Sequence, residues 1–302
     1  MPAAETPPAA ILDLLRELGD LKRGRSAAHE GSIAERLFAH AWGWLVAGGE
    51  VADVWRSVTA AALAATRLGD LDEAALAAVG VPAEAARDIL RRALEEACEG
   101  LPPALTDALL AGLDVDALRE VPPPFVARLA RQPRAGVTCP GKPRLLLEPP
   151  ENHAEHCLMT AAYAAILAPT YGAEPGTVFL ASLAHHLHNV WLPDSGFAGE
   201  VLMGEHLEPA FARATELALA ELPPALADAT REARRILPDA GTPEGRTFHA
   251  ADTLDRVLQI EQHLRAGKAT MGYVLHDMAL VHAGPVKDFQ DRLLAAVGLF
   301  AP

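Results

Sequence analysis

Residues 178–187 read VFLASLAHHL and mark the centre of the predicted fold. The first seven positions are apolar or small on every side, which is typical of a helix buried in the middle of a helical bundle. The stretch then places His185 and His186 next to each other. Consecutive helical residues point about 100° apart. Burying both imidazoles is therefore costly unless polar partners or a shared metal ion satisfy them.

The rest of the chain has the same helical character. Half of its 302 residues are hydrophobic, and proline and glycine fall between long apolar-periodic runs. Runs of β-branched and aromatic residues with period two do not recur, so strands are not expected. The length allows one large domain or two of ordinary size. The sequence therefore predicts an all-α protein.

Charge and cysteine content limit the possible partners and location. The net charge of −14 argues against a nucleic-acid polymer or an anionic membrane as partner, but allows a small phosphorylated metabolite. The three cysteines, Cys98, Cys139 and Cys157, form no CxxC pair, which argues against a disulfide scaffold or a cysteine-based zinc site. No signal-like N-terminus and no stretch of eighteen apolar residues occur, so a cytoplasmic location is expected.

Four residues carry a metal-site prediction: His156 in ENHAEH (151–156), the pair His185 and His186, and Asp252 in HAADTLD (249–255). In this order they resemble the ligand motif of the HD superfamily of metal-dependent phosphohydrolases, over roughly residues 145–270, and most of all its 5′-deoxynucleotidase-type members. The resemblance implies a helical domain that hydrolyses a nucleotide or another small phosphate ester. It also implies a divalent transition metal (Mn, Co, Fe, Zn or Ni), for which imidazole and carboxylate are usual ligands.

The resemblance suggests further site residues. His206 is a candidate fifth ligand, because some HD proteins with two or three metals use extra histidines near such a position. Arg144 occupies the place of an arginine that holds phosphate in the relatives, although an ordinary linker arginine is the alternative. The catalytic glutamate of the relatives falls on Asn189, which cannot transfer a proton. Asp194 and Glu200, on the following glycine-containing loop, are therefore the candidate proton-transfer residues.

The pair His-His replaces the His-Asp of the family, and this departure changes the expected chemistry. Neutral His186 bridges two metals less well than an aspartate, so a mononuclear centre of three histidines and one aspartate is the simplest expectation. One alternative is a non-catalytic HD-like protein that binds a metal or ligand or acts in signalling. A second alternative is an HD-type iron oxygenase. No glycine-rich phosphate loop, Ser-His-Asp set or Rossmann fingerprint indicates a competing enzyme class.

The chain also contains an internal similarity. LPPALTD (101–107) matches LPPALAD (222–228) at an offset of 121, and IAER (33–36) resembles HAEH (153–156) at an offset of 120. The apolar stretch 54–65 resembles 178–189 at an offset of 124. Chance similarity between two Ala- and Leu-rich helical stretches is the alternative. Duplication predicts tandem HD-like helical bundles, one at 1–138 and one at 139–302, joined by a linker at 132–143 without an apolar face.

The first bundle would lack a metal site. Arg36 stands in place of His156, the alanines at 61–62 in place of the histidine pair, and Leu129 in place of Asp252. Ten of the twelve histidines lie in the second half, as this hypothesis requires. We expect the corresponding pocket in the first half to be filled by side chains. The two halves would pack as a pseudo-dimer, and a homodimer of whole chains stays open.

Overall fold

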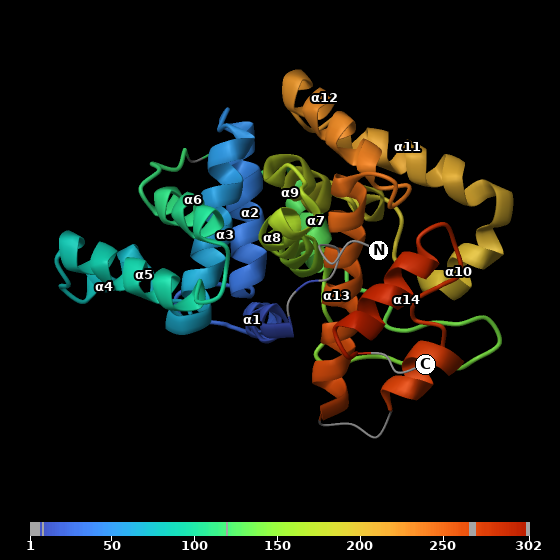
Figure 1. Ribbon diagram of the computed structural model, residues 1–302. Coiled ribbons are helices and arrows are strands. Elements are labelled where there is room, and N and C mark those ends of the chain that lie inside the picture. Colours follow the sequence, from blue (N-terminus) through green and yellow to red (C-terminus); the bar gives the residue numbers. More distant parts are fainter. Residues whose placement is uncertain (1–6, 8, 119, 266–269, 300–302) are drawn as a thin grey trace.

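The computed structural model describes residues 7, 9–118, 120–265 and 270–299, and these residues form an all-α fold (Figure 1). This confirms the predicted fold class. Within these ranges, β-type pairing is limited to isolated bridges. No helix found there has both the length and the apolarity needed to cross a membrane.

The first half contains seven α-helices and one 3₁₀ turn within the described residues: α1 (Ala9–Gly19), η2 (Asp20–Lys22), α2 (Ile33–Val46), α3 (Val51–Leu68), α4 (Glu73–Ala78), α5 (Ala83–Ala97), α6 (Pro103–Leu113) and α7 (Pro124–Arg131). The second half contains α8 (His153–Tyr171), α9 (Pro175–Ala184), η3 (Leu187–Val190), α10 (Gly196–Met203), η4 (Gly204–His206), α11 (Leu207–Leu219), α12 (Pro224–Ala233), η5 (Arg234–Ile236), α13 (Pro243–Arg265), the π-helical turn η6 (Tyr273–Asp277) and α14 (Lys287–Ala296).

Helices α2 and α8 begin with the same N-terminal capping arrangement. Ser32 and Glu35 form a capping box at the start of α2, in which the Glu35 N–H donates to Ser32 Oγ at 3.1 Å and the Ser32 N–H donates to Glu35 Oε2 at 2.6 Å. Asn152 and Glu155 form the same box at the start of α8, at 3.0 and 2.9 Å. These reciprocal bonds satisfy N–H groups that a helix start otherwise leaves unpaired.

The helices follow the same order in both halves. α2 and α8 start 120 residues apart, α3 and α9 start 124 apart, α5 and α11 start 124 apart, and α6 and α12 start 121 apart. α3 packs against α5 and α6, while α9 and η3 pack against α12 and α11. Corresponding helices also meet between the halves, α2 with α8 and α3 with α9. That each half is an HD-type bundle derived by duplication stays a prediction.

Helices α8, α9 and α13 lie in the middle of the molecule (Figure 1). Seventeen of the nineteen residues of α8 are buried, as are residues 178–184 of α9, so the apolar stretch occupies the centre as predicted. One hydrophobic core runs from Ile11 to Val297 and includes residues of both halves. The expected boundary at residue 138 therefore divides the sequence but not the core.

The segment expected to be a linker is a structural part of the second half. Ala135, Val137 and Thr138 are buried. Val137 and Leu145 exchange two backbone hydrogen bonds of 2.9 Å, and Pro133 forms a bridge with Asn152. The expectation that this stretch lacks an apolar face was wrong, because Val137 belongs to a buried hydrophobic cluster with Val257 and Ile260 of α13.

Candidate functional site

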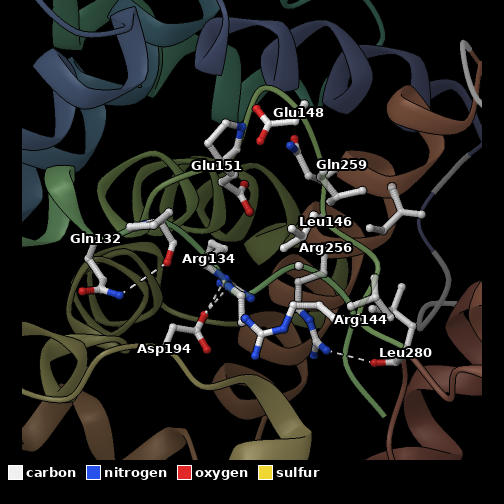
Figure 2. Close-up of a pocket in the computed structure, with 17 residues that line it drawn as sticks. Gln132, Arg134, Arg144, Leu146, Glu148, Glu151, Asp194, Arg256, Gln259 and Leu280 are labelled. Carbon is white, nitrogen blue, oxygen red and sulfur yellow. Dashed lines mark hydrogen bonds and ion pairs between the residues drawn. The ribbon is translucent and has the colours of Figure 1, made fainter. Parts of the chain in front are cut away.

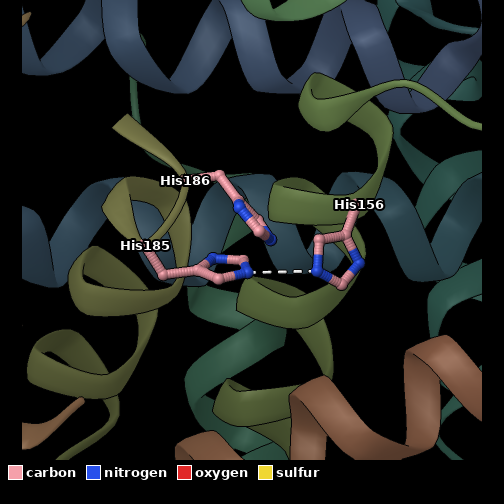
Figure 3. A group of neighbouring side chains, drawn as sticks. All are labelled: His156, His185 and His186. Carbon is pink, nitrogen blue, oxygen red and sulfur yellow. Dashed lines mark hydrogen bonds between the residues drawn. The ribbon is translucent and has the colours of Figure 1, made fainter. Parts of the chain in front are cut away.

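The predicted metal-binding residues of three helices lie close together. His156 comes from the first turn of α8, His185 and His186 follow the last residue of α9, and Asp252 comes from the middle of α13. One ring nitrogen from each histidine lies within 4.8 Å of the other two (Figure 3). Asp252 Oδ1 lies 3.2 Å from His156 Nε2 and 3.9 Å from His185 Nε2.

The end of α9 explains how two adjacent histidines reach one point. The helix ends at Ala184, and His185 is its C-cap residue. His186, with φ −100° and ψ 22°, has already left helical geometry. The two side chains are therefore not held about 100° apart as they would be inside a helix, and their ring centroids lie 4.2 Å apart.

Each histidine uses its Nδ1 atom in a hydrogen bond away from the cluster. His156 Nδ1 lies 2.7 Å from Asp255 Oδ2, His185 Nδ1 lies 2.5 Å from the Ser182 carbonyl oxygen, and His186 Nδ1 lies 2.8 Å from Asn189 Oδ1. All three acceptors are oxygens, so Nδ1 is the donor in each case. The lone pair therefore lies on Nε2 of all three rings. The Nε2 atoms of His156 and His185 face each other, and that of His186 accepts a hydrogen bond from Arg134.

The donor set fits a divalent metal ion. Burial lowers the pKa of His185 and of His186 well below the ordinary value, which favours the neutral, ligating form of both rings. The Nε2 atoms of His156 and His185 lie only 3.1 Å apart. Tetrahedral nitrogen ligands held at about 2.0–2.1 Å from zinc would be about 3.3 Å apart. A cation bound by both atoms would offset the repulsion between their two lone pairs.

Asp252 can supply the negative charge of such a site. Burial by itself raises the pKa of this carboxyl group, but the interaction with His156 and the charge of Arg256 outweigh it and lower the pKa below the usual range. Asp252 therefore stays ionised at neutral pH beside the two imidazoles.

A buried ion network lies behind His156. The Lys22 ammonium lies 2.6 Å from Asp255 Oδ1 and 2.5 Å from Glu151 Oε1. The three side chains are 3%, 1% and 6% exposed, respectively. Burial alone would lower the pKa of Lys22, but the charges of Asp255 and Glu151 raise it above its ordinary value. Lys22 thus holds Asp255 in place, and Asp255 orients His156.

The same network forms a second group with metal-ligand spacing, made of Glu151, His156 and Asp255. Its two carboxylates already share the Lys22 ammonium. The histidine cluster around Asp252 is therefore the better candidate for a metal ion, because the Nε2 atoms of His156 and His185 face each other and Asp252 rather than a shared ammonium group.

The cluster borders a cavity of about 320 Å³, whose wall includes His185, His186 and Asp252. Two arginines also line it. Arg134, from the segment before α8, donates from Nη1 to His186 Nε2 at 3.1 Å. Arg256 lies 3.8 Å from Asp252 Oδ2, one turn further along α13. The cavity thus places positively charged donors next to the candidate metal site.

The predicted proton-transfer residues Asp194 and Glu200 both line this cavity. Asp194 accepts backbone N–H bonds from Ala135 at 3.0 Å and Gly196 at 2.9 Å, so both of its oxygens help to fix the surrounding loops. Burial, together with the nearby charge of Asp194, raises the pKa of Glu200. Glu200 is therefore the better suited of the two to carry a proton.

The other two predicted residues lie outside the cluster. Arg144 lines a neighbouring cavity of about 330 Å³, which shares Arg134 and Arg256 with the first (Figure 2). Its Nη2 donates to the Ser195 carbonyl oxygen at 3.3 Å. His206 is exposed in η4 and belongs to neither of the groups with metal-ligand spacing among the described residues. The structure does not bring His206 to the other candidate ligands.

Several site residues were not identified from the sequence. Arg134 lay in the supposed linker, and Lys22 lies 129 residues before its partner Glu151. Asp255 could have been identified from the sequence, because a residue three positions after Asp252 lies near it on the surface of a helix. Asn189, expected only as a lost catalytic acid, fixes the ring of His186.

His153 lies beside the candidate ligands. It is fully buried, and its ring centroid lies 4.6 Å from that of His186. Its Nε2 lies 3.6 Å from Asp194 Oδ2, too far for a hydrogen bond. Burial, assisted by the charge of Arg134, lowers the pKa of His153 well below its ordinary value. A neutral imidazole therefore packs beside the cluster.

Comparison of the chain with protein-family models, curated proteins and solved structures finds no match. Among the described residues, buried histidine and carboxylate groups could hold a metal ion.

Proposed function

We propose that this protein is a metal-dependent phosphohydrolase that acts on a nucleotide or another small phosphate ester. The observation that carries the proposal is the grouping of His156, His185, His186 and Asp252 beside an open, arginine-lined cavity. The sequence resemblance to the HD superfamily points to the same activity.

His156, His185 and His186 would hold the metal through Nε2, and Asp252 would hold it through a carboxylate oxygen. Such an ion, from the group Mn, Co, Fe, Zn and Ni, would polarise a phosphoryl oxygen and lower the pKa of a water molecule. Asp255 and Asn189 would keep two of the imidazoles in the ligating orientation through their Nδ1 bonds.

The arginines would recognise the phosphate. Arg134 and Arg256 present guanidinium groups to the cavity beside the cluster, and guanidinium N–H groups match phosphate oxygens in geometry and charge. Arg144, in the adjoining cavity, would contact a more distant part of the substrate (Figure 2). Because the net charge of the protein is negative, these arginines would attract a phosphate only within a short distance of the cavity.

Glu200 would transfer the proton that the leaving group needs. Its raised pKa brings it closer to neutrality, where a carboxyl group can both hold and release a proton. Asp194 would keep the surrounding loops in position through its two backbone hydrogen bonds.

The test begins with purified protein that is stripped of metal and reloaded separately with Mn²⁺, Co²⁺, Fe²⁺, Zn²⁺ or Ni²⁺. Phosphate release is then measured from nucleoside monophosphates and from a generic aryl phosphate. We expect release with at least one metal, and loss of both bound metal and activity in the double variant His185→Ala/Asp252→Ala. His206→Ala is the matched control, since it removes an exposed imidazole outside the cluster.

Unchanged metal content in the double variant would refute the assignment of the ligands. Bound metal without phosphate release from any substrate would favour a metal- or ligand-binding protein. Oxygen consumption with Fe²⁺, in place of phosphate release, would favour an oxygenase.

A further inference from the structure

The first half contains a cavity of about 400 Å³. Its apolar lining comes mainly from Ile33, Leu37, Leu68 and Leu90, together with three alanines of α3. The three alanines are Ala61, Ala64 and Ala65. The cavity therefore lies between α2, α3 and α5, with α4 at its edge.

This cavity lies at the same place in the helix order as the candidate metal site. Ala61, Ala64 and Ala65 precede His185, His188 and Asn189 by 124 residues, the same offset that relates the starts of α3 and α9. All three later residues line the cavity at the histidine cluster. Methyl groups thus replace imidazole and amide groups on this wall of the cavity.

The expectation that side chains fill this place holds for only part of it. Arg36, at the position corresponding to His156, lines the cavity and pairs with Asp70. Ala61 lines it as well, whereas Ala62 and Leu129, which correspond to His186 and Asp252, are fully buried and outside the lining.

Charged residues around the cavity are paired with one another. Arg36 binds Asp70, Arg87 Nε lies 3.3 Å from Glu73 Oε1, and Arg91 Nη2 lies 3.0 Å from Asp114 Oδ2. The remaining acid in the lining, Asp72, accepts a hydrogen bond from the Ala75 N–H at the start of α4. Opposite charges in the lining thus largely neutralise one another, which favours an uncharged occupant over an anion or a cation.

We propose that this cavity binds a small, uncharged, mainly apolar molecule of about the size of a bicyclic aromatic. Its volume lies within the range of about 300–1,000 Å³ that is usual for small-molecule sites, and such sites are mostly apolar. Binding is driven by removal of apolar surface from water on both sides. The site is separate from the histidine cluster and does not depend on the hydrolase activity.

The test uses N-phenyl-1-naphthylamine, an uncharged probe whose fluorescence increases in apolar surroundings. We expect saturable binding to the full-length protein and an affinity at least tenfold lower in Ala61→Leu and in Ala65→Leu. Both alanines are only partly buried and line the cavity, so a larger side chain can extend into it. Ala77→Leu, at an exposed position of α4 outside the lining, is the matched control and is expected to bind like the wild type.

Melting temperature and metal content of each variant show that the fold is retained. The proposal would be overturned if the wild type showed no saturable binding, or if Ala61→Leu and Ala65→Leu bound the probe as tightly as the wild type. The sulfonated analogue 1-anilinonaphthalene-8-sulfonate tests the charge argument, since equal affinity for this anion would overturn the assignment of an uncharged ligand.

Discussion

Replacing Lys22 with methionine tests whether the buried network behind His156 supports both the fold and the site. Methionine fills most of the space of the lysine stem but removes the ammonium group. Two carboxylates, on Glu151 and Asp255, would then lie buried without the cation that lies 2.5 and 2.6 Å from them. Breaking a buried pair by removing one partner costs about 3–5 kcal/mol. We expect a loss of this size in the free energy of unfolding.

The raised pKa of Lys22 fixes the pH range of this effect. A lysine whose pKa is higher in the folded than in the unfolded protein stabilises the folded state. This contribution is complete at any pH below the unfolded pKa of about 10.4. That stabilisation is lost only as the pH rises through the higher folded value. The Lys22 ammonium therefore contributes its full stabilisation throughout the range from about pH 6 to pH 9.

The assay is equilibrium unfolding in urea, followed by circular dichroism of metal-free protein. Arg87→Met is the matched control, because Arg87 and its partner Glu73 are 70% and 55% exposed. An exposed pair of this kind contributes at most about 1 kcal/mol. A second control is Lys22→Met/Glu151→Gln, which removes one of the uncompensated carboxylates and should be more stable than Lys22→Met alone.

The same variant should also weaken metal binding. Asp255 would lose its fixed orientation, and loss of a group that orients a metal ligand costs about 10–100-fold in affinity. Competition with a chelator measures this in the full-length protein. If Lys22→Met is no less stable than Arg87→Met and binds metal as the wild type does, the argument from the buried network is refuted.

Three further predictions concern other parts of the molecule. Gly112→Ala should destabilise the protein by about 1–3 kcal/mol in urea unfolding, because the added Cβ would lie 2.6 Å from the Arg56 carbonyl carbon; a stabilised variant would contradict the close packing of α6 on α3. Asn189→Ala should lower metal affinity by about 10–100-fold, since the Nδ1–H of His186 loses its acceptor, and unchanged affinity in chelator competition would show that another group orients the ring. Burial raises the pKa of Cys98 to about 11, so its reaction rate with a thiol reagent should rise about tenfold per unit from pH 8 to pH 10; a plateau near pH 8.5 would disprove this.

The sequence was sufficient to predict the all-α class and the position of the central helix. Both depend on patterns within a few turns, namely a stretch that is apolar on every side and proline or glycine between helices. The same holds for the start of α8, since Asn152 and Glu155 cap it through contacts three residues apart. The close approach of His156, His185 and Asp252 was also predictable, because their order along the chain resembles a known motif.

The tertiary structure decided the surroundings of these residues. The sequence gives no local signal that Lys22 would contact Glu151, which lies 129 residues later. It also gives none that Arg134, in the segment expected to be a linker, would contact His186. The cavity at Ala61 likewise depends on how α5 packs beside α3. Helix formation is encoded by neighbours three or four positions apart, whereas buried charges and cavities depend on which helices pack together, and that choice depends on the whole core.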